Sequence, residues 1–228
     1  MVYLIFLCMV IRHVDTSRIE ISHKYKKIQI SNLNGNIGIE YIPSDTCLYL
    51  KIKKKAKGKI EKFKEWINEV KVIINEENDF CKIKVKYPEK FKGIKDESVD
   101  LTLILPYEME YVEAKVLNGN IKIKDLVSQK YRIEVLNGDV EIKEISGEGK
   151  VEVNNGNINF TISHDKILDT KLEILNGDIS ISCPSFTQVF PEVINGKIEG
   201  DLTFEKLDIF QKIKCEVFNG DIRVKRRK

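Results

Sequence analysis

The chain has 228 residues, of which 32% are charged, and its 38 lysines and arginines nearly balance its 35 aspartates and glutamates. This length can bury the core of one large all-β or repeat domain, and the small net charge gives no reason to expect a nucleic-acid partner. The five cysteines are scattered without a CxxC pair, which argues against a disulfide framework or a zinc site. The high content of Lys, Glu and Ile is typical of thermophile proteins.

The chain begins with an apolar segment, which we place at residues 1–18. Its apolar run from Val2 to Ile11 is shorter than the about 20 residues that a membrane-spanning helix needs. It lacks the positive n-region and cleavage site of a signal peptide. Two interpretations stay open: a strand or short helix on the end of the fold, and a truncated membrane anchor. Residues 1–11 are therefore the part through which the chain would associate with a membrane.

Residues 19–106 form an N-terminal β part that contains one predicted helix. Apolar and polar residues alternate from Ile19 to Ile42, which predicts strands. Between residues 59 and 70 the apolar residues fall at helical spacing and predict an amphipathic helix of about three turns. Its apolar stripe is expected to pack on the sheet or to cap an end of it. Further strands follow up to Leu105, and Pro106 ends this part.

Residues 107–228 form a repeat array that joins 19–106 in one unit. Asn-Gly pairs recur in it at intervals of 18 to 24 residues, and one further pair lies in the N-terminal part. The seven pairs are Asn34-Gly35, Asn118-Gly119, Asn137-Gly138, Asn155-Gly156, Asn176-Gly177, Asn195-Gly196 and Asn219-Gly220. Apolar residues mostly stand two and four positions before each Asn and two and four after each Gly. Such a repeat predicts one stacked structural unit per copy.

Two architectures fit the repeat. Each Asn-Gly pair is either a type I′ hairpin turn, with Val135 facing Val140, or the corner of one coil in a β-solenoid. The residue before Asn is apolar in five of the six array copies, whereas in a hairpin it would lie on the solvated face. We therefore predict an all-β solenoid with coils of about 19 residues, in which the corner turns this residue inward. Stacked Asn side chains would form a hydrogen-bonded ladder along the corner.

The sequence predicts no catalytic, cofactor-binding or metal-binding residue, and the protein is not expected to be an enzyme. The seven Asn-Gly pairs are interpreted as structural turns, because Gly supplies the positive φ that other residues resist. A calcium site between coils is disfavoured, since Lys197 interrupts the row of Asn and Asp residues that follows the glycines. The basic cluster from Arg223 to Lys228 is expected to be a solvated, frayed end.

The order of these motifs carries a family resemblance. The segment Val99-Asp-Leu-Thr-Leu-Ile-Leu-Pro106, the following Lys115-Val-Leu-Asn-Gly-Asn-Ile and the repeated Asn-Gly-Asp/Asn-Ile/Val resemble β-strand-repeat proteins of unknown function described as putative adhesins. The resemblance covers roughly residue 19 to the C-terminus. It implies an envelope- or membrane-associated protein, with the cytoplasm as the alternative compartment, and it implies no catalytic residue.

Two classes of function remain from the sequence. The first is a non-enzymatic, adhesin-like scaffold that binds a protein or cell-surface partner, and that could also form oligomers through its exposed solenoid ends. The second is a polysaccharide-binding or polysaccharide-active solenoid, which should show an aromatic stripe and paired carboxylates on one face.

Overall fold

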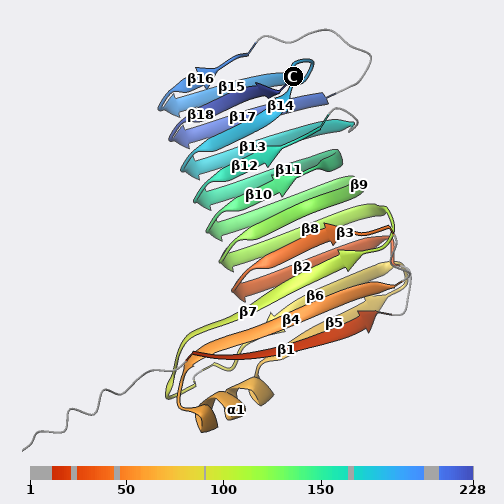
Figure 1. Cartoon of the computed structure of the whole chain (residues 1–228), viewed down its shortest axis with the longest axis vertical. Helices are drawn as coiled ribbons and strands as arrows, with labels where there is room; N and C mark the ends of the chain where they lie inside the picture. Colours follow the sequence, from red (N-terminus) through yellow and green to blue (C-terminus); the bar gives the residue numbers. More distant parts are fainter. Residues whose placement is uncertain are drawn as a thin grey trace, which may run out of the picture.

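The protein is an all-β solenoid, as the sequence predicts. The computed structural model describes residues 12–21, 25–43, 47–89, 91–163, 167–202 and 211–227. In these residues eighteen strands form one continuous sheet, which winds on itself into an elongated stack with one helix at its N-terminal end (Figure 1). Residues 1–11, with the two interpretations of the apolar N-terminus, lie outside the described residues.

The elements of the first half are the strands β1 (Arg12–Ile21), β2 (Lys27–Asn34), β3 (Ile37–Tyr41) and β4 (Leu48–Gly58), the helix α1 (Ile60–Glu69), and the strands β5 (Lys71–Glu77), β6 (Phe80–Lys86) and β7 (Ile94–Leu105). The helix agrees with the predicted range of 59–70. Residues 12–18, which the sequence placed in a separate apolar segment, belong to the fold as part of β1, which pairs antiparallel with β4.

The second half consists of the strands β8 (Met109–Asn118), β9 (Ile121–Asn137), β10 (Val140–Lys143), β11 (Ile145–Asn155), β12 (Ile158–Thr161), β13 (Leu168–Asn176), β14 (Ile179–Pro184), β15 (Gln188–Asn195), β16 (Ile198–Gly200), β17 (Gln211–Asn219) and β18 (Ile222–Arg227). All pairings within this half are parallel.

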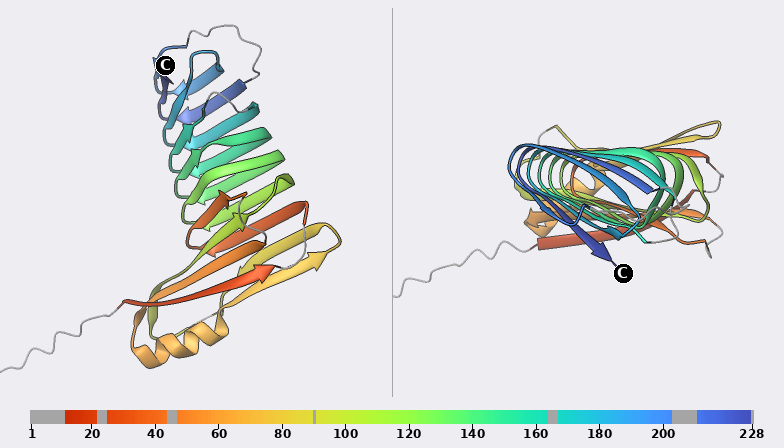
Figure 2. Two further views of the ribbon diagram at one scale, coloured as in Figure 1. Left: turned by 45° about the vertical axis from the view of Figure 1, so that its right-hand side comes forward. Right: turned by 90° about the horizontal axis from the view of Figure 1, so that it is seen from above.

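Each coil crosses two faces of a flattened tube (Figure 2). On face B the strands before the Asn-Gly corners stack on β6 in the order β2, β8, β9, β11, β13, β17, β15. On face A the strands after the corners stack in the order β3, β9, β10, β12, β14, β18, β16. Val140 pairs with Ile121 and Ile158 of the neighbouring coils, so the hairpin alternative is wrong.

The order of the coils in space differs from their order in the chain. The Asn34 coil lies directly on the Asn118 coil, although 84 residues separate them. The intervening residues form β4 to β7, which continue the stack beyond that coil. At the other end the last two coils are exchanged, because Asn219 stacks on Asn176 and Asn195 stacks outside Asn219. The Asn34 coil therefore belongs to the repeat array, which the predicted division at residues 106–107 does not reflect.

Two hydrogen-bonded ladders hold the corners together. Six of the seven Asn-Gly asparagines donate Nδ2 to the Oδ1 of the Asn in the adjacent coil, over 2.9–3.0 Å, and Asn34 accepts at the end of this ladder. The residue after each Gly accepts a bond from the backbone N–H of its counterpart in the next coil, as when Asp178 Oδ1 accepts from Asp221 N over 2.9 Å. Lys197 lies in the terminal coil, beyond which no further coil is described whose backbone N–H would need an acceptor at this position. This explains why a lysine, which cannot accept a hydrogen bond, replaces the Asn or Asp of the other coils.

The interior is filled by stacked rows of apolar side chains. The residues two before Asn form one such row, Val116, Val135, Val153, Ile174 and Val217, and all of them are buried. Like residues stack because parallel coils are in register, with neighbouring strands about 4.8 Å apart. Each fully buried Val, Leu or Ile side chain contributes about 1.5–3 kcal/mol. The apolar positions of the repeat are therefore the core of the solenoid.

In the Asn34 coil this inner position is polar. Asn32 is buried and donates its Nδ2 to the backbone oxygen of Val99 over 2.6 Å, while the Tyr87 hydroxyl donates to its Oδ1 over 3.1 Å. The Asn34 backbone oxygen is a second acceptor for the single hydrogen of this hydroxyl, whose oxygen accepts from Val99 N–H over 3.2 Å. Burial raises the pKa of Tyr87. This network attaches β7 to the first Asn-Gly coil.

The helix α1 covers the N-terminal end of the stack, as its apolar stripe predicts. Phe63 and Trp66 are buried, and α1 contacts β1, β4 and β7. Lys54 of β4 donates from Nζ to the backbone oxygens of Ile67 and Val70, over 2.7 Å each, at the C-terminal end of the helix. These carbonyls lack partners within the helix, and a lysine there also suits the helix dipole. Burial lowers the pKa of Lys54.

The basic residues from Arg223 to Arg227 are part of the sheet, which corrects the expectation of a frayed end for them, and Lys228 lies outside the described residues. Arg223 forms ion pairs with Asp178 and Asp221 over 2.9 Å each. Arg226 donates to the backbone oxygens of Pro184 and Thr187 over 3.0 and 2.7 Å. The alternation Ile222-Arg-Val224 continues the strand pattern of the array, so Arg223 points outward while Ile222 and Val224 fill the core, and Arg226 is half-buried.

Candidate functional site

The residue before each Asn lies on the outside of face B, so the prediction that it turns inward is wrong. These residues form a row along the Asn-Gly edge that we call the apolar ladder: in spatial order Leu33, Leu117, Leu136, Asn154, Leu175, Phe218 and Ile194. The exposed fraction of its six apolar members is between 36% and 65%. The strand alternation continues up to the corner, which places this residue opposite to the buried residue beside it.

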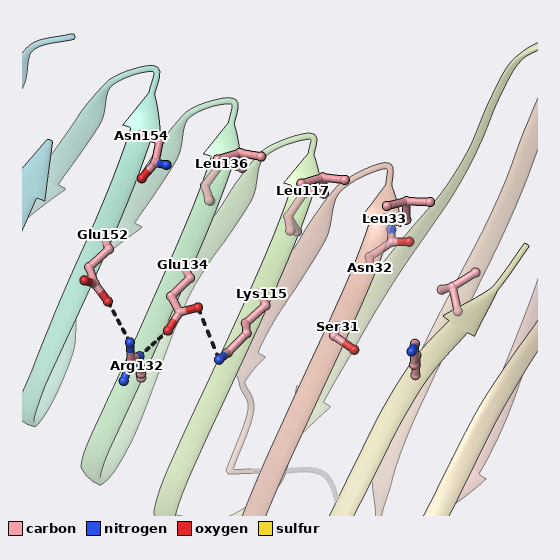
Figure 3. Close-up of a pocket in the computed structure, with 14 residues that line it drawn as sticks. Ser31, Asn32, Leu33, Lys115, Leu117, Arg132, Glu134, Leu136, Glu152 and Asn154 are labelled. Atoms are coloured by element: carbon pink, nitrogen blue, oxygen red, sulfur yellow. Dashed lines mark hydrogen bonds and ion pairs between the residues drawn. The ribbon is translucent and has the colours of Figure 1, made fainter. Parts of the chain in front are cut away.

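The apolar ladder borders two hollows on face B. One has a volume of about 600 Å³ and is lined by Leu33, Leu117, Leu136 and Asn154, among others (Figure 3). The other, of about 450 Å³, is lined by Asn154, Leu175, Ile194 and Phe218 on its apolar side. Six exposed apolar side chains in one line are more than scattered surface residues, and such patches mark interaction sites. The ladder is therefore the main candidate for a binding surface.

A row of charged residues runs beside the ladder and forms a continuous zipper. Glutamates stack in successive coils from Glu134 to Glu216, and basic residues bridge them within and between coils. In the coils of Glu134, Glu152 and Glu173 the bridging basic residue stands two positions before the glutamate, whereas Lys115 stands two positions after Glu113 and stacks on Glu134. The ion pairs are Lys115–Glu113, Lys115–Glu134, Arg132–Glu134, Arg132–Glu152, Lys150–Glu152, Lys150–Glu173, Lys171–Glu173 and Lys171–Glu216. Figure 3 shows the part around Arg132. Without these cations the stacked carboxylates would repel one another.

Glu173 of the zipper is a poor candidate for the general acid of glycoside chemistry. A general acid in such an enzyme needs a raised pKa. Burial acts to raise the pKa of Glu173, but hydrogen bonds from Lys150 and Lys171 outweigh it and hold the pKa below its usual value. Phe218 lies beside the carboxylates of the zipper, yet it is the one aromatic member, or rung, of the apolar ladder. Among the described residues, Phe190 is the other exposed phenylalanine on face B. Glu173 therefore does not fit the role of the proton donor that the predicted polysaccharide-active alternative requires.

The Asn-Gly pairs lie at the corner beside the ladder, where their side chains bond to one another along the stack. Among the described residues no group of three or more His, Cys, Asp or Glu is placed to hold a metal ion. Cys81, Cys183 and Cys215 are buried and free. In the part of the chain that the structure covers, no helix has the length and apolar character to cross a bilayer.

Acid is expected to destabilise the solenoid through its outer carboxylates. A hydrogen bond from the Asp221 backbone and one from Arg223 lower the pKa of Asp178 from 3.8, and hydrogen bonds from Lys122 and Lys143 lower that of Glu141 from 4.5. The unfolded chain therefore binds more protons, and the free energy of unfolding should fall as pH drops below about 4.5. Denaturant titrations between about pH 7 and about pH 3 measure this loss.

The matched control for this prediction is Asp178→Asn. Asn157 fills the same position in the neighbouring coil and accepts from Asp178 N over 3.0 Å, so an amide keeps the corner ladder intact. The variant removes only the charge and its pair with Arg223, and its loss of stability in acid should be smaller than that of the parent. An identical acid profile for both proteins would contradict the assignment to Asp178.

A family model described as Toastrack DUF4097 matches residues 16–228. Among solved structures, a putative cell adhesion protein from Clostridium sporogenes ATCC 15579 aligns with a TM-score of 0.52 at 13% identity, over 94% of this chain and 100% of that one. A putative adhesin from Bacteroides fragilis NCTC 9343 aligns at 15% identity over 93% and 97% of the two chains, with a TM-score of 0.38.

A protein from Parabacteroides distasonis ATCC 8503 described as a putative lipid binding protein also aligns at 15% identity over 93% and 97% of the two chains, with a TM-score of 0.36. No curated protein sequence matches the chain. At these identities the first of the structures supports the solenoid fold alone.

Proposed function

The chain belongs to the Toastrack DUF4097 family, and from that premise we propose that it is a non-enzymatic, adhesin-like scaffold that binds other proteins through its apolar ladder. The observation that carries this proposal is the line of six exposed apolar side chains beside the Asn-Gly corners. A rigid stack of coils keeps these side chains at fixed spacing, so little order has to be imposed on them when a partner binds.

The surroundings of the ladder support a protein partner. The zipper of ion pairs forms a polar rim on one side of the ladder, and the Asn ladder of the corners forms another on the opposite side. An apolar centre within a polar rim is the general anatomy of protein interfaces. The neighbours described as adhesion proteins are consistent with this proposal.

The test compares capture of extract proteins by the wild-type chain and by Leu117→Lys/Leu136→Lys. Two lysines in the ladder should reduce capture at least about 10-fold, because each must lose water or leave the apolar contact open. The control Asn159→Lys/Ser180→Lys adds the same charges to the outside of face A in neighbouring coils and should retain capture. Equal capture by all three proteins, or binding of glycans alone, would contradict the proposal.

A further inference from the structure

The apolar ladder has the same order of apolar and polar residues from either end of the stack. Counted along the stack it has three apolar rungs, then Asn154, then three apolar rungs again. A two-fold axis through Asn154 would pair Leu33 with Ile194, Leu117 with Phe218 and Leu136 with Leu175. Every apolar rung then meets an apolar rung, and the polar rung meets itself. This symmetry is not apparent from the order of the residues in the chain, because the Ile194 and Phe218 coils are exchanged in space.

The spacing of the rungs suits a second solenoid better than a peptide. Neighbouring rungs are about 4.8 Å apart, the distance between paired strands. Residues on one side of an extended strand repeat every about 6.8 Å, and successive turns of an α-helix every about 5.4 Å, so either falls out of step within a few rungs. A second copy of this chain has the same rise and stays in step over all seven rungs, a length of about 29 Å.

The charges beside the ladder select the antiparallel arrangement. In the row next to it, Lys84 and Lys115 lie at the N-terminal end and Glu216 and Glu192 at the C-terminal end. Antiparallel copies bring Lys115 to the level of Glu216, and Lys84 close to Glu192, which has no ion pair among the described residues. The antiparallel arrangement also brings Glu134 to the level of Glu173 and Glu152 to the level of its own counterpart. Parallel copies would bring Lys115 and all five glutamates of this row to the level of their own counterparts and would form no pair of opposite charges, which costs more free energy.

The two hollows are complementary in the same arrangement. Asn154 lines both of them, so the axis passes between them. Each copy would place its Phe218, the largest rung, against Leu117 in the larger hollow of the other copy. A buried Asn within an apolar seam costs stability but fixes register, since any shift leaves the amide against an apolar rung.

We infer that the apolar ladder is the seam of an antiparallel homodimer, with Asn154 of both copies meeting on its two-fold axis. This inference rests on the proposed function, because it takes the same binding surface and names a second copy of this chain as its partner. The contact is isologous, so it closes with two copies and leaves the solenoid ends outside the interface.

The first measurement is the mass of the whole chain in solution, by sedimentation equilibrium from about 1 to about 100 µM. The wild type is expected to reach twice the monomer mass. Leu136→Lys should stay monomeric or show a dissociation constant at least about 10-fold higher. The control Ser180→Lys, on the outside of face A, should dimerise as the wild type does. Circular dichroism establishes that both variants are folded.

The second measurement uses disulfide trapping in a background with Cys8→Ser and Cys47→Ser, since the other three cysteines are buried. Asn154→Cys should form a disulfide-linked dimer on mild oxidation, because its Cβ atoms would meet near the axis. Leu33→Cys alone should not, whereas a mixture of Leu33→Cys and Ile194→Cys proteins should form the mixed dimer. Parallel copies would make each single variant cross-link with itself.

A monomeric wild type at all concentrations would overturn the inference, and so would a dimer in which Leu33→Cys cross-links with itself as readily as Asn154→Cys. Loss of partner capture by Leu117→Lys/Leu136→Lys in a monomeric protein would leave the proposed function standing without the dimer. A dimer with the expected cross-links, but no capture of other proteins through the ladder, would support self-association and contradict the wider scaffold function.

Discussion

Replacement of Gly138 by valine is expected to lower the free energy of unfolding by roughly 4 kcal/mol or more. Gly138 has φ +145°, and a Cβ atom placed on it would lie 2.1 Å from the backbone oxygen of Gly119 in the adjacent coil. A β-branched residue cannot adopt this conformation without strain, and the clash is with backbone, which cannot rotate away. The corner would have to open and break the bonds from Asn137 to its neighbours. Denaturant unfolding measures the loss.

The control for this prediction lies three residues further on. Glu141 points outward on face A, where Lys122 and Lys143 contact it. Glu141→Lys disturbs only exposed ion pairs, which contribute about 0–1 kcal/mol each, so its stability should remain close to that of the wild type. Equal unfolding midpoints for Gly138→Val and Glu141→Lys would refute the assignment of Gly138 to a coil corner.

Replacement of Trp66 by alanine is expected to cost about 3–5 kcal/mol. Trp66 is fully buried beneath α1, and its ring stacks on Phe63 with centroids 5.9 Å apart. The truncation removes apolar contact and leaves a cavity between the helix and the end of the stack. Since α1 covers this end, its release would expose core rows that otherwise have no covering layer, and the variant should aggregate at lower temperature.

Ile60→Ala is the matched control on the same helix, because Ile60 lies in the first turn and is 43% exposed. Its effect on the unfolding midpoint should be small. Thermal unfolding followed by circular dichroism and light scattering separates loss of stability from aggregation. If both variants melted together with the wild type, α1 would contribute nothing to the stability of the stack.

The repeated pattern was sufficient to predict the solenoid, because every copy carries the same geometric requirement. The Gly conformation, the apolar residues two positions on either side and the stacking Asn side chains are local features, and local features repeat in sequence. The helix was predictable for the same reason, since the spacing of Phe63, Trp66 and Val70 differs from strand alternation. Both depend on residues within a few positions of one another.

The coil order and the outer position of the ladder were missed for different reasons. The exchange of the Asn195 and Asn219 copies depends on contacts between residues distant in sequence, and the local difference between them, Lys197 in place of Asp221, does not by itself specify the order of the coils. The ladder was within reach of the sequence. Ile133 and Val135 point inward, and strict alternation places Leu136 outward. The apolar character of Leu136 favours a buried position and its place in the alternation an exposed one, and burial is only one explanation of an apolar residue, since a binding surface is another.

The exchange of the last two coils has a consequence for synthesis. Residues 188–200 occupy the outermost coil, but their hydrogen-bonded neighbours are residues 211–227, which the ribosome adds later. Until then β15 and β16 lack the strands with which they pair, and no coil covers the one that ends at β14. The last two coils must therefore join together, after translation of this region, and a truncation before β17 would remove two rungs from the stack rather than one.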